Sequence, residues 1–213
     1  MNRRILSRVA LLLAASIALP LQTASAGTCE VSPFVGAMIP ANTLLLLTSA
    51  GSYIRMKTHT IYGLDVEHSL SPRMSLGAVL ATGTGSMEVV GGTTALEIGS
   101  TAFIADLRGR FRLMGTEDDN LGLVLGVGYT DFNSGLLDLA HETDTGTFLG
   151  RLTGIAGVDL HGRLTDRLGL KAVFVDRIHV SGLSASGLTG PDNVEKTQND
   201  LCITAGLTIK TGH

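Results

Sequence analysis

The sequence lacks an excess of basic residues, and this lack excludes one class of partner. It contains 16 Lys and Arg against 19 Asp and Glu, which gives a formal net charge of −3. Three of the basic residues, Arg3, Arg4 and Arg8, lie in an N-terminal segment without acidic residues, so the rest of the chain is more acidic still. Because nucleic-acid binding depends on neutralising phosphates, we expect no nucleic-acid partner.

Metal-ligand and phosphate-loop motifs are also lacking. The six histidines are scattered, without the paired spacing of metal ligands. Gly83-Thr84-Gly85 lacks the lysine that a phosphate-binding loop needs. We therefore expect no metal and no cofactor.

The N-terminal segment has the three parts of a signal peptide. The basic residues precede an apolar core, Val9–Leu21, and Ala24-Ser25-Ala26 supplies small residues for cleavage. The core is short for a transmembrane helix, although an uncleaved membrane anchor is the alternative. We predict that residues 1–26 are a signal peptide removed after Ala26, and that residues 27–213 form one domain.

The rest of the chain has no apolar run as long as a membrane helix, yet 44% of the sequence is hydrophobic and 27 residues are glycine. The apolar residues alternate with polar or small ones over runs of roughly ten residues, the length of a tilted membrane strand. Eight such runs are present: Val31–Ile39, Thr58–Leu70, Met74–Thr82, Thr101–Met114, Leu121–Thr130, Thr147–Leu164, Leu168–Val180 and Asp200–Thr211.

The connectors between these runs alternate in length. Three are short and rich in turn-forming residues: 71–73, 115–120 and 165–167. The other four are long: 40–57, 83–100, 131–146 and 181–199. Bacterial outer-membrane barrels have short periplasmic turns and long outer loops. We therefore predict an all-β fold, an eight-stranded antiparallel up-and-down transmembrane barrel.

The two faces of the predicted strand 101–114 differ in charge. One face carries apolar residues such as Phe103, Leu107 and Phe111, and the other carries Asp106 and three arginines. In a membrane barrel the apolar face contacts lipid and the charged face lines the lumen. The same reasoning over all strands places these charged residues in the lumen: Asp65, Glu67, Asp106, Arg108, Arg110, Arg112, Arg151, Asp159, Arg163, Lys171, Arg177 and Lys210.

These lumen charges allow two interpretations. An eight-stranded barrel is just wide enough for side chains to fill, and buried charges must pair because an isolated one is costly. A salt-bridged plug is the interpretation we favour, and a narrow basic pore is the alternative. Glycines at inward positions of 121–130 would leave room for the arginines opposite them.

The two cysteines lie near opposite ends of adjacent antiparallel strands in this layout. At about 3.3 Å per residue, Cys29 and Cys202 are tens of ångströms apart. A disulfide needs Cα atoms within about 7 Å. We expect two free thiols.

The chain resembles the small eight-stranded outer-membrane barrels, the OmpA/OmpX-like family of the Gram-negative cell envelope. The resemblance rests on the leader, the opening strand Val31-Ser32-Pro33-Phe34-Val35-Gly36 and the connector rhythm. It implies an outer-membrane monomer that contacts lipid or lipopolysaccharide, with a surface partner for the long loops. The family ends on an aromatic residue, whereas this chain ends Lys210-Thr211-Gly212-His213.

Aromatic residues are only 4% of the sequence, and tryptophan is absent, so the interfacial aromatic girdles must be thin. The candidate anchors are Tyr62, Phe103, Phe111, Tyr129, Phe148 and Phe174. The run Leu44–Leu47 either extends the first strand or forms an apolar patch on the outer surface.

One arrangement of residues resembles the triad of outer-membrane lipid A deacylases. His179 and Ser181 have the His-x-Ser spacing, and Glu195 follows in the last long connector. Gly182 replaces the asparagine that follows the serine in that family, and alternation places His179 on the lumen side. We therefore predict a non-enzymatic structural or surface-interaction barrel without catalytic residues. A small-solute pore, a deacylase and a soluble periplasmic barrel are the alternatives.

Overall fold

The structure, a computed structural model, describes residues 28–41, 43–47, 52–91, 93–116, 118–134, 151–181 and 196–211. The predicted leader and cleavage site therefore lie outside the described residues. In the described part, no helix is long and apolar enough to cross a membrane. The elements there are β-strands, as the alternating pattern predicted.

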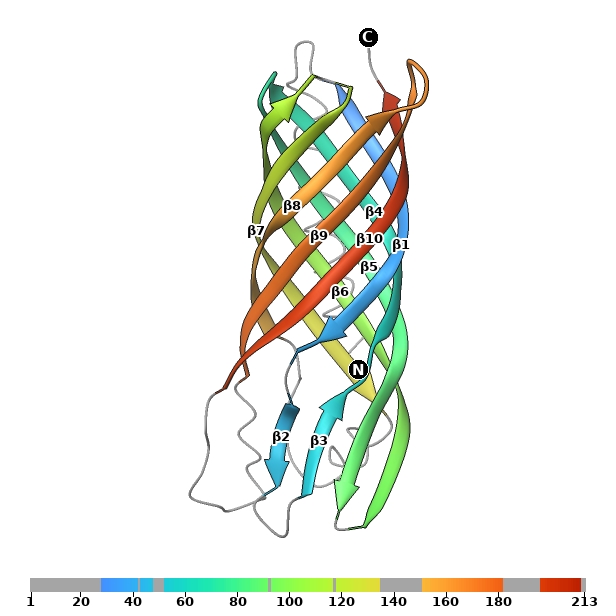
Figure 1. The fold of residues 1–213 in the computed structure, drawn as a ribbon, viewed down its shortest axis with the longest axis vertical. Coiled ribbons are helices and arrows are strands. Elements are labelled where there is room, and N and C mark those ends of the chain that lie inside the picture. The colour runs from blue at the N-terminus through green and yellow to red at the C-terminus, as the bar shows by residue number, and fades with distance from the viewer. Residues whose placement is uncertain are drawn as a thin grey trace, which may run out of the picture.

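Eight strands form a closed ring in which every neighbouring pair is antiparallel (Figure 1). They are β1 (Cys29–Pro40), β4 (His59–Ser71), β5 (Met74–Gly91), β6 (Thr94–Gly115), β7 (Asn120–Ser134), β8 (Arg151–Arg163), β9 (Leu168–Ser181) and β10 (Lys196–Thr211). The pairing of β1 with β10 closes the ring. The predicted eight-stranded up-and-down barrel is confirmed.

Short turns join the strands at one end of the ring. The turn between β6 and β7 begins at Gly115, whose φ of 98° is a left-handed conformation that glycine adopts without a steric penalty. The hydroxyl of Thr116 then accepts hydrogen bonds from the backbone N–H groups of Asp118 and Asp119. Thr165 does the same for Arg167 and Leu168 in the turn between β8 and β9.

The opposite end differs from the sequence prediction, because much of the predicted connector 83–100 is strand. β5 and β6 stay paired from Gly83 and Ala102 up to Gly91 and Thr94, leaving a hairpin turn of two residues. Side chains continue to alternate between the two faces through this segment, but the segment is rich in glycine and serine, which are common in loops. Residues 131–134 and 196–199, also predicted as connectors, belong to β7 and β10.

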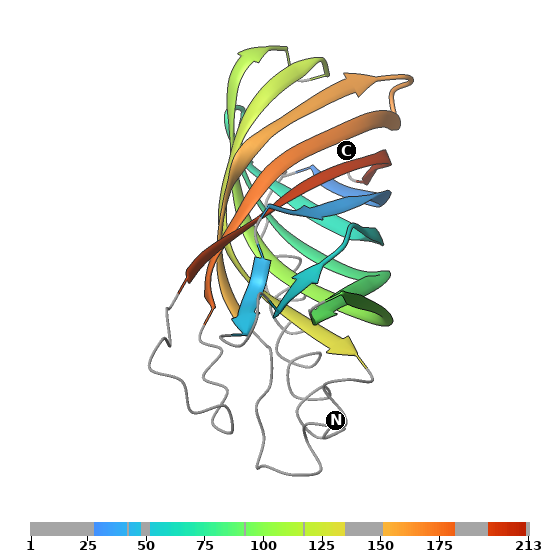
Figure 2. The same ribbon diagram turned by 60° about the horizontal axis from the view of Figure 1, so that its bottom comes forward.

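Two further strands lie in the first predicted connector, 40–57. β2 (Thr43–Leu47) pairs with β3 (Ser52–Met56), and β3 pairs with β5. Together with 85–91 of β5 and 94–100 of β6 they form a four-stranded sheet, here called the extension, which projects beyond the ring (Figures 1 and 2). The run Leu44–Leu47 is thus a strand of its own, paired away from β1.

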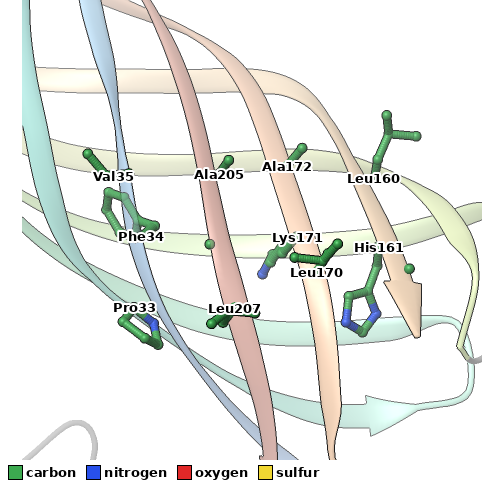
Figure 3. A pocket seen from close by; sticks show the side chains of 12 residues that line it. Pro33, Phe34, Val35, Leu160, His161, Leu170, Lys171, Ala172, Ala205 and Leu207 are labelled. Atoms are coloured by element: carbon green, nitrogen blue, oxygen red, sulfur yellow. The ribbon is translucent and has the colours of Figure 1, made fainter. Parts of the chain in front are cut away.

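The wall of the ring has an apolar outer face. Leu107, Leu125 and Leu170 are each more than two-fifths exposed. Ile104 and Asp106 lie on the opposite face of β6 from Leu107, and they are buried. Figure 3 shows this alternation around an outer hollow of about 800 Å³, where Leu160 and Ala172 point away from their sequence neighbours His161 and Lys171. Of the predicted aromatic anchors, Phe148 lies outside the described residues.

The interior buries both apolar and charged side chains. Buried apolar side chains such as Met38, Met87 and Phe132 lie toward the end that carries the extension. Buried charged side chains such as Glu67 and Lys171 lie toward the end with the short turns. Cys29 and Cys202 are free thiols, as expected from their separation along the strands.

Candidate functional site: the charged barrel interior

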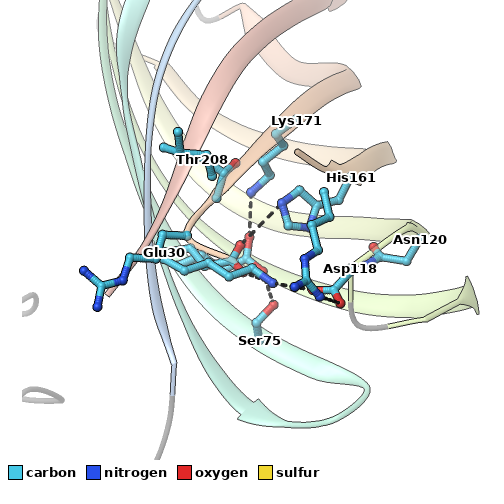
Figure 4. A network of polar contacts seen from close by, with 12 residues as sticks. Glu30, Ser75, Asp118, Asn120, His161, Lys171 and Thr208 are labelled. Carbon is cyan, nitrogen blue, oxygen red and sulfur yellow. Dashed lines mark hydrogen bonds and ion pairs between the residues drawn. The ribbon is translucent and has the colours of Figure 1, made fainter. Parts of the chain in front are cut away.

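Lys171 of β9, whose side chain points into the lumen in Figure 4, contacts two carboxylates of β4. Its Nζ atom lies 3.0 Å from Oδ2 of Asp65 and 2.6 Å from Oε2 of Glu67. All three side chains are at most one-tenth exposed. Ser75 of β5 donates a further hydrogen bond to Oε1 of Glu67. Two carboxylates therefore offset the desolvation of one buried ammonium group.

Arg110 continues this chain of contacts to the far side of the ring. Its Nη1 atom lies 3.8 Å from Oε1 of Glu67, and its Nε atom pairs with Asp159 of β8. Its Nη2 atom donates to the side-chain oxygen of Asn120. The contacts run from β9 to β4, then to β6 and β8. We call Lys171, Asp65, Glu67, Arg110 and Asp159 the interior web.

A second ion-paired group surrounds Arg177, which is fully buried. Its two terminal nitrogens donate to Asp106 at 2.7 and 2.9 Å, the forked geometry that suits a carboxylate. One of them also donates to the Thr130 hydroxyl at 2.8 Å. Arg108 donates to the same carboxylate at 2.6 Å. Two arginines thus share Asp106.

A third, more exposed group lies at the short-turn end. The Asp118 carboxylate accepts from Lys210 at 3.0 Å and from Arg163 at 2.6 Å. These two hydrogen bonds hold the pKa of Asp118 below its ordinary value. Lys210 also lies 3.8 Å from Glu30, and Glu30 lies 4.0 Å from Nε2 of His161.

The structure brings some, but not all, of the predicted lumen residues into ion-paired groups. Arg163 lies at the rim with its side chain 40% exposed, and Arg112 has no ion pair among the described residues. The side chain of Arg151 lies outside the described ones. The sequence analysis missed several polar partners: Glu30, Ser75, Asp118, Asn120 and Thr130. Glu30 was missed because the predicted first strand began at Val31, two residues after the start of β1.

Glycines of β7 make room for the interior charges. A Cβ atom at Gly122 would overlap Oδ1 of Asp159 and lie 2.9 Å from Nε of Arg110. A Cβ atom at Gly128 would overlap Oδ1 of Asp106. The glycines of β7 therefore leave space in the lumen, as expected. The carboxylates of Asp159 and Asp106 occupy this space together with the side chain of Arg110.

Comparison with known proteins bears on the fold. The chain matches no protein-family model and no curated protein sequence. Among solved structures it is similar to the outer membrane protein OprG from Pseudomonas aeruginosa, with a TM-score of 0.60 and 14% identity over 88% of this chain and 97% of that one. The chain has the fold of a small outer-membrane β-barrel.

Two further outer-membrane barrels match more distantly. Neisserial surface protein A has a TM-score of 0.47 and 10% identity over 88% of this chain and 98% of that one. The outer membrane protease OmpT from Escherichia coli has a TM-score of 0.43 and 12% identity over 89% of this chain and 98% of that one.

The described part of the barrel holds no cluster of metal ligands. No group of three or more His, Cys, Asp or Glu residues there is placed to hold a metal ion. Of the deacylase-like residues, Glu195 and the side chains of His179 and Ser181 lie outside the described ones. The backbone of His179 is paired with Thr153 and Gln198 inside the barrel wall.

The outer face of the barrel changes from apolar to charged in three steps toward the extension. Tyr62, Thr82 and Phe103 lie side by side on one row of the sheet. The next row, two residues further, consists of Thr60, Thr84 and Thr101, all exposed. Beyond it, the same face carries four charged residues: Arg55, Lys57, Glu88 and Glu97.

These four residues form the collar cluster at the base of the extension. Arg55 pairs with Glu88, and Nζ of Lys57 lies 3.2 Å from Glu97 and 3.6 Å from Glu88. The Ser86 hydroxyl and Lys57 together hold the pKa of Glu97 below its ordinary value. The cations adjoin a polar hollow of about 610 Å³ between the end of β1 and strands β3 and β5.

Proposed function

We propose that this chain is an outer-membrane protein with a closed, ion-paired lumen, which presents its extension and longer connections at the cell surface. Its role is structural or one of surface interaction, without catalysis. The observation that carries the proposal is the interior web, because its contacts cross the lumen from β9 through β4 and β6 to β8.

The change of the outer face supports the membrane placement. Tyrosine and phenylalanine favour the boundary between lipid and water, and the row with Tyr62 and Phe103 lies where the apolar wall ends. The charged collar cluster beyond it would be unfavourable within the hydrocarbon layer. The short-turn end then lies in the periplasm, as in bacterial outer-membrane barrels.

Cysteine labelling in intact cells tests this placement. In a background with Cys29→Ser and Cys202→Ser, Leu96→Cys and Leu107→Cys place single thiols at two exposed positions of the same strand, β6, one in the extension and one on the outer wall. A membrane-impermeant maleimide should label position 96, which lies in the extension. Position 107 should stay unlabelled because lipid covers it.

Fractionation provides the second arm of the test. The full-length chain should remain in the outer-membrane fraction after a high-salt wash, because its apolar wall is held by lipid. Release by salt would show that it is a soluble or peripheral barrel. Equal labelling at positions 96 and 107 would also contradict the proposed membrane boundary.

A further inference from the structure

His59 lies at the junction where the ring passes into the extension. It is the first residue of β4, it is fully buried, and it lies opposite Met38 of β1. Its imidazole ring reaches across β5 at Gly85, where an added Cβ atom would lie 2.6 Å from the ring. Beyond Gly85 the ring meets Ser100 of β6. One side chain therefore connects β4 to both strands that continue from the ring into the extension (Figure 2).

Both ring nitrogens of His59 have partners that suit a neutral imidazole. Nδ1 lies 2.8 Å from the backbone carbonyl oxygen of Lys57. A carbonyl only accepts, so Nδ1 carries the proton and donates it. Nε2 lies 2.7 Å from the Ser100 hydroxyl, from which an unprotonated nitrogen accepts a hydrogen bond. A second proton would reverse this bond and add a charge.

The neighbours of the ring do not balance such a charge. Met38 and Phe132 are buried and apolar, and the Phe132 ring packs edge to face against the imidazole with 5.8 Å between the ring centres. Among the described residues, no carboxylate forms a hydrogen bond or an ion pair with His59. Burying a charged group without a partner is unfavourable.

The charged residues of the neighbouring elements face elsewhere or are already paired. Those of β3, β5, β6 and β7 near this level lie on the outer face: Arg55, Lys57, Glu88, Glu97 and Asp131. Arg177 of β9 and Asp200 of β10 face the lumen, and both have partners of their own. His59 is therefore the titratable group at the junction whose charge has no counterpart among the described residues.

His59 lies outside the apolar wall, one residue beyond Thr60. Burial lowers its pKa below the ordinary value of 6.5, and the hydrogen bond to the Lys57 carbonyl opposes this shift only in part. A histidine with a lowered folded-state pKa binds protons more readily after it leaves its site. Its stabilising contribution is thus present above the ordinary pKa and is lost as the pH falls below that value.

We infer that His59 is a pH-sensitive switch, which holds the base of the extension to the ring while neutral and releases it in acid. Release would separate Met56 and Met87, which are buried at this base, from the apolar core of the ring. In the orientation proposed above, the junction adjoins the medium outside the cell. That part of the inference rests on the proposed function, and it means that external acid would loosen the extension.

Hydrogen exchange of the full-length chain in detergent micelles tests the inference. The measured quantity is the protection factor, the ratio of the unprotected exchange rate at a given pH to the observed rate. Between about pH 7.5 and about pH 5, protection of 55–59, 84–88 and 97–101 should fall several-fold. The fall should reach at most about thirtyfold, the limit set by an ordinary pKa of 6.5. Residues 204–209 of β10, within the ring, should keep their protection.

Two variants separate His59 from other histidines. His59→Gln carries an amide that stays neutral at every pH, so protection at the junction should differ by less than about twofold between the two pH values. His68→Gln removes a half-buried histidine near the short turns and should respond to pH as the wild type does.

Nitrogen NMR of the wild-type protein provides a measurement that needs no variant. The His59 signal can be identified by its through-space contact with the Phe132 ring. It should report a neutral ring with its proton on Nδ1 at about pH 6, where an ordinary histidine is mostly charged.

Four results would overturn the inference. They are unchanged wild-type protection at the junction, an equal loss in His59→Gln, an equal loss at 204–209, and a charged His59 at about pH 6. An equal loss at 204–209 would show that acid unfolds the whole barrel. Failure of the proposed function would appear instead as release from membranes by salt, and it would leave these micelle measurements unchanged.

Discussion

At the scale of single residues, the interior charges are stabilised by shared partners. Asp106 accepts from two arginines, and Lys171 donates to two carboxylates. Removing one member of a buried ion pair is strongly destabilising because it leaves an uncompensated charge. Each such residue therefore contributes to stability chiefly by balancing its partners.

Replacing Lys171 with methionine should lower the free energy of unfolding by about 3–5 kcal/mol, because Asp65 and Glu67 would lose their shared cation. Urea unfolding of the protein in lipid vesicles measures the change. Arg73→Met, on an exposed turn, is the control and should alter stability by less than about 0.5 kcal/mol. A Lys171 variant as stable as this control would show that the carboxylates are compensated elsewhere.

Gly128 should tolerate no side chain. Alanine there would place a Cβ atom onto Oδ1 of Asp106, and the forced movement should destabilise the barrel by about 1–3 kcal/mol. Gly99→Ala is the matched control, because nothing lies within 4 Å of its added Cβ. Unfolding midpoints of the two variants provide the comparison, and equal midpoints would contradict the steric argument.

The sequence predicted which face of each strand carries the charged residues, but it could not predict which of these residues form ion pairs with one another. A period of two places Lys171 and Glu67 on inward faces without any knowledge of the fold. Their contact spans 104 residues, and it depends on how far each strand is shifted along its neighbour. That shift comes from strand tilt and ring closure, which no local pattern encodes.

At the scale of elements, the turns were easier to predict than the ends of the strands. Turns such as 115–120 combine glycine, threonine and acidic residues whose backbone hydrogen bonds are local. The segment 83–100 was predicted as a loop because glycine and serine are common in loops. Its strands are held instead by pairing with each other and with β3, which is nonlocal information.

The turn between β6 and β7 should contribute a pH-dependent stability through Asp118. Its pKa is depressed by Lys210 and Arg163, so its contribution is present above the ordinary aspartate pKa and is lost as the pH falls through the folded-state value. Since the carboxylate is partly exposed to solvent, Asp118→Asn should cost at most about 1 kcal/mol at neutral pH.

Urea unfolding at a series of pH values measures this contribution. The wild type and Asp118→Asn should converge in stability as the carboxylate becomes protonated. Lys210→Met should lose similar stability at neutral pH and converge in the same way. A constant difference between wild type and Asp118→Asn down to low pH would instead assign the effect to the shape of the turn.

At the scale of the whole molecule, ion-paired side chains cross the lumen at more than one level. The interior web spans it near the short turns, Arg177 and Asp106 pair further along, and side chains such as Met38, Met87 and Phe132 pack toward the extension. From these contacts we expect the closed barrel proposed above.

Planar bilayers containing the purified protein should therefore show no discrete conductance steps. An eight-stranded barrel has little space beyond its own side chains, and the web ties those side chains together. A porin inserted under the same conditions serves as the positive control. Reproducible ohmic steps from the wild-type protein would favour the small-solute pore over the closed barrel.

The pairing of β1 with β10 is the seam of the wall. Val31 lies opposite Ile209, and Pro40 opposite Asp200, so strands from the two ends of the described chain are neighbours. Contacts between such distant segments form slowly. Until β10 arrives, the growing sheet is a curled ribbon with two unpaired edges, which readily join other chains. Safe assembly of this protein therefore depends on shielding both edges until the last strand is in place.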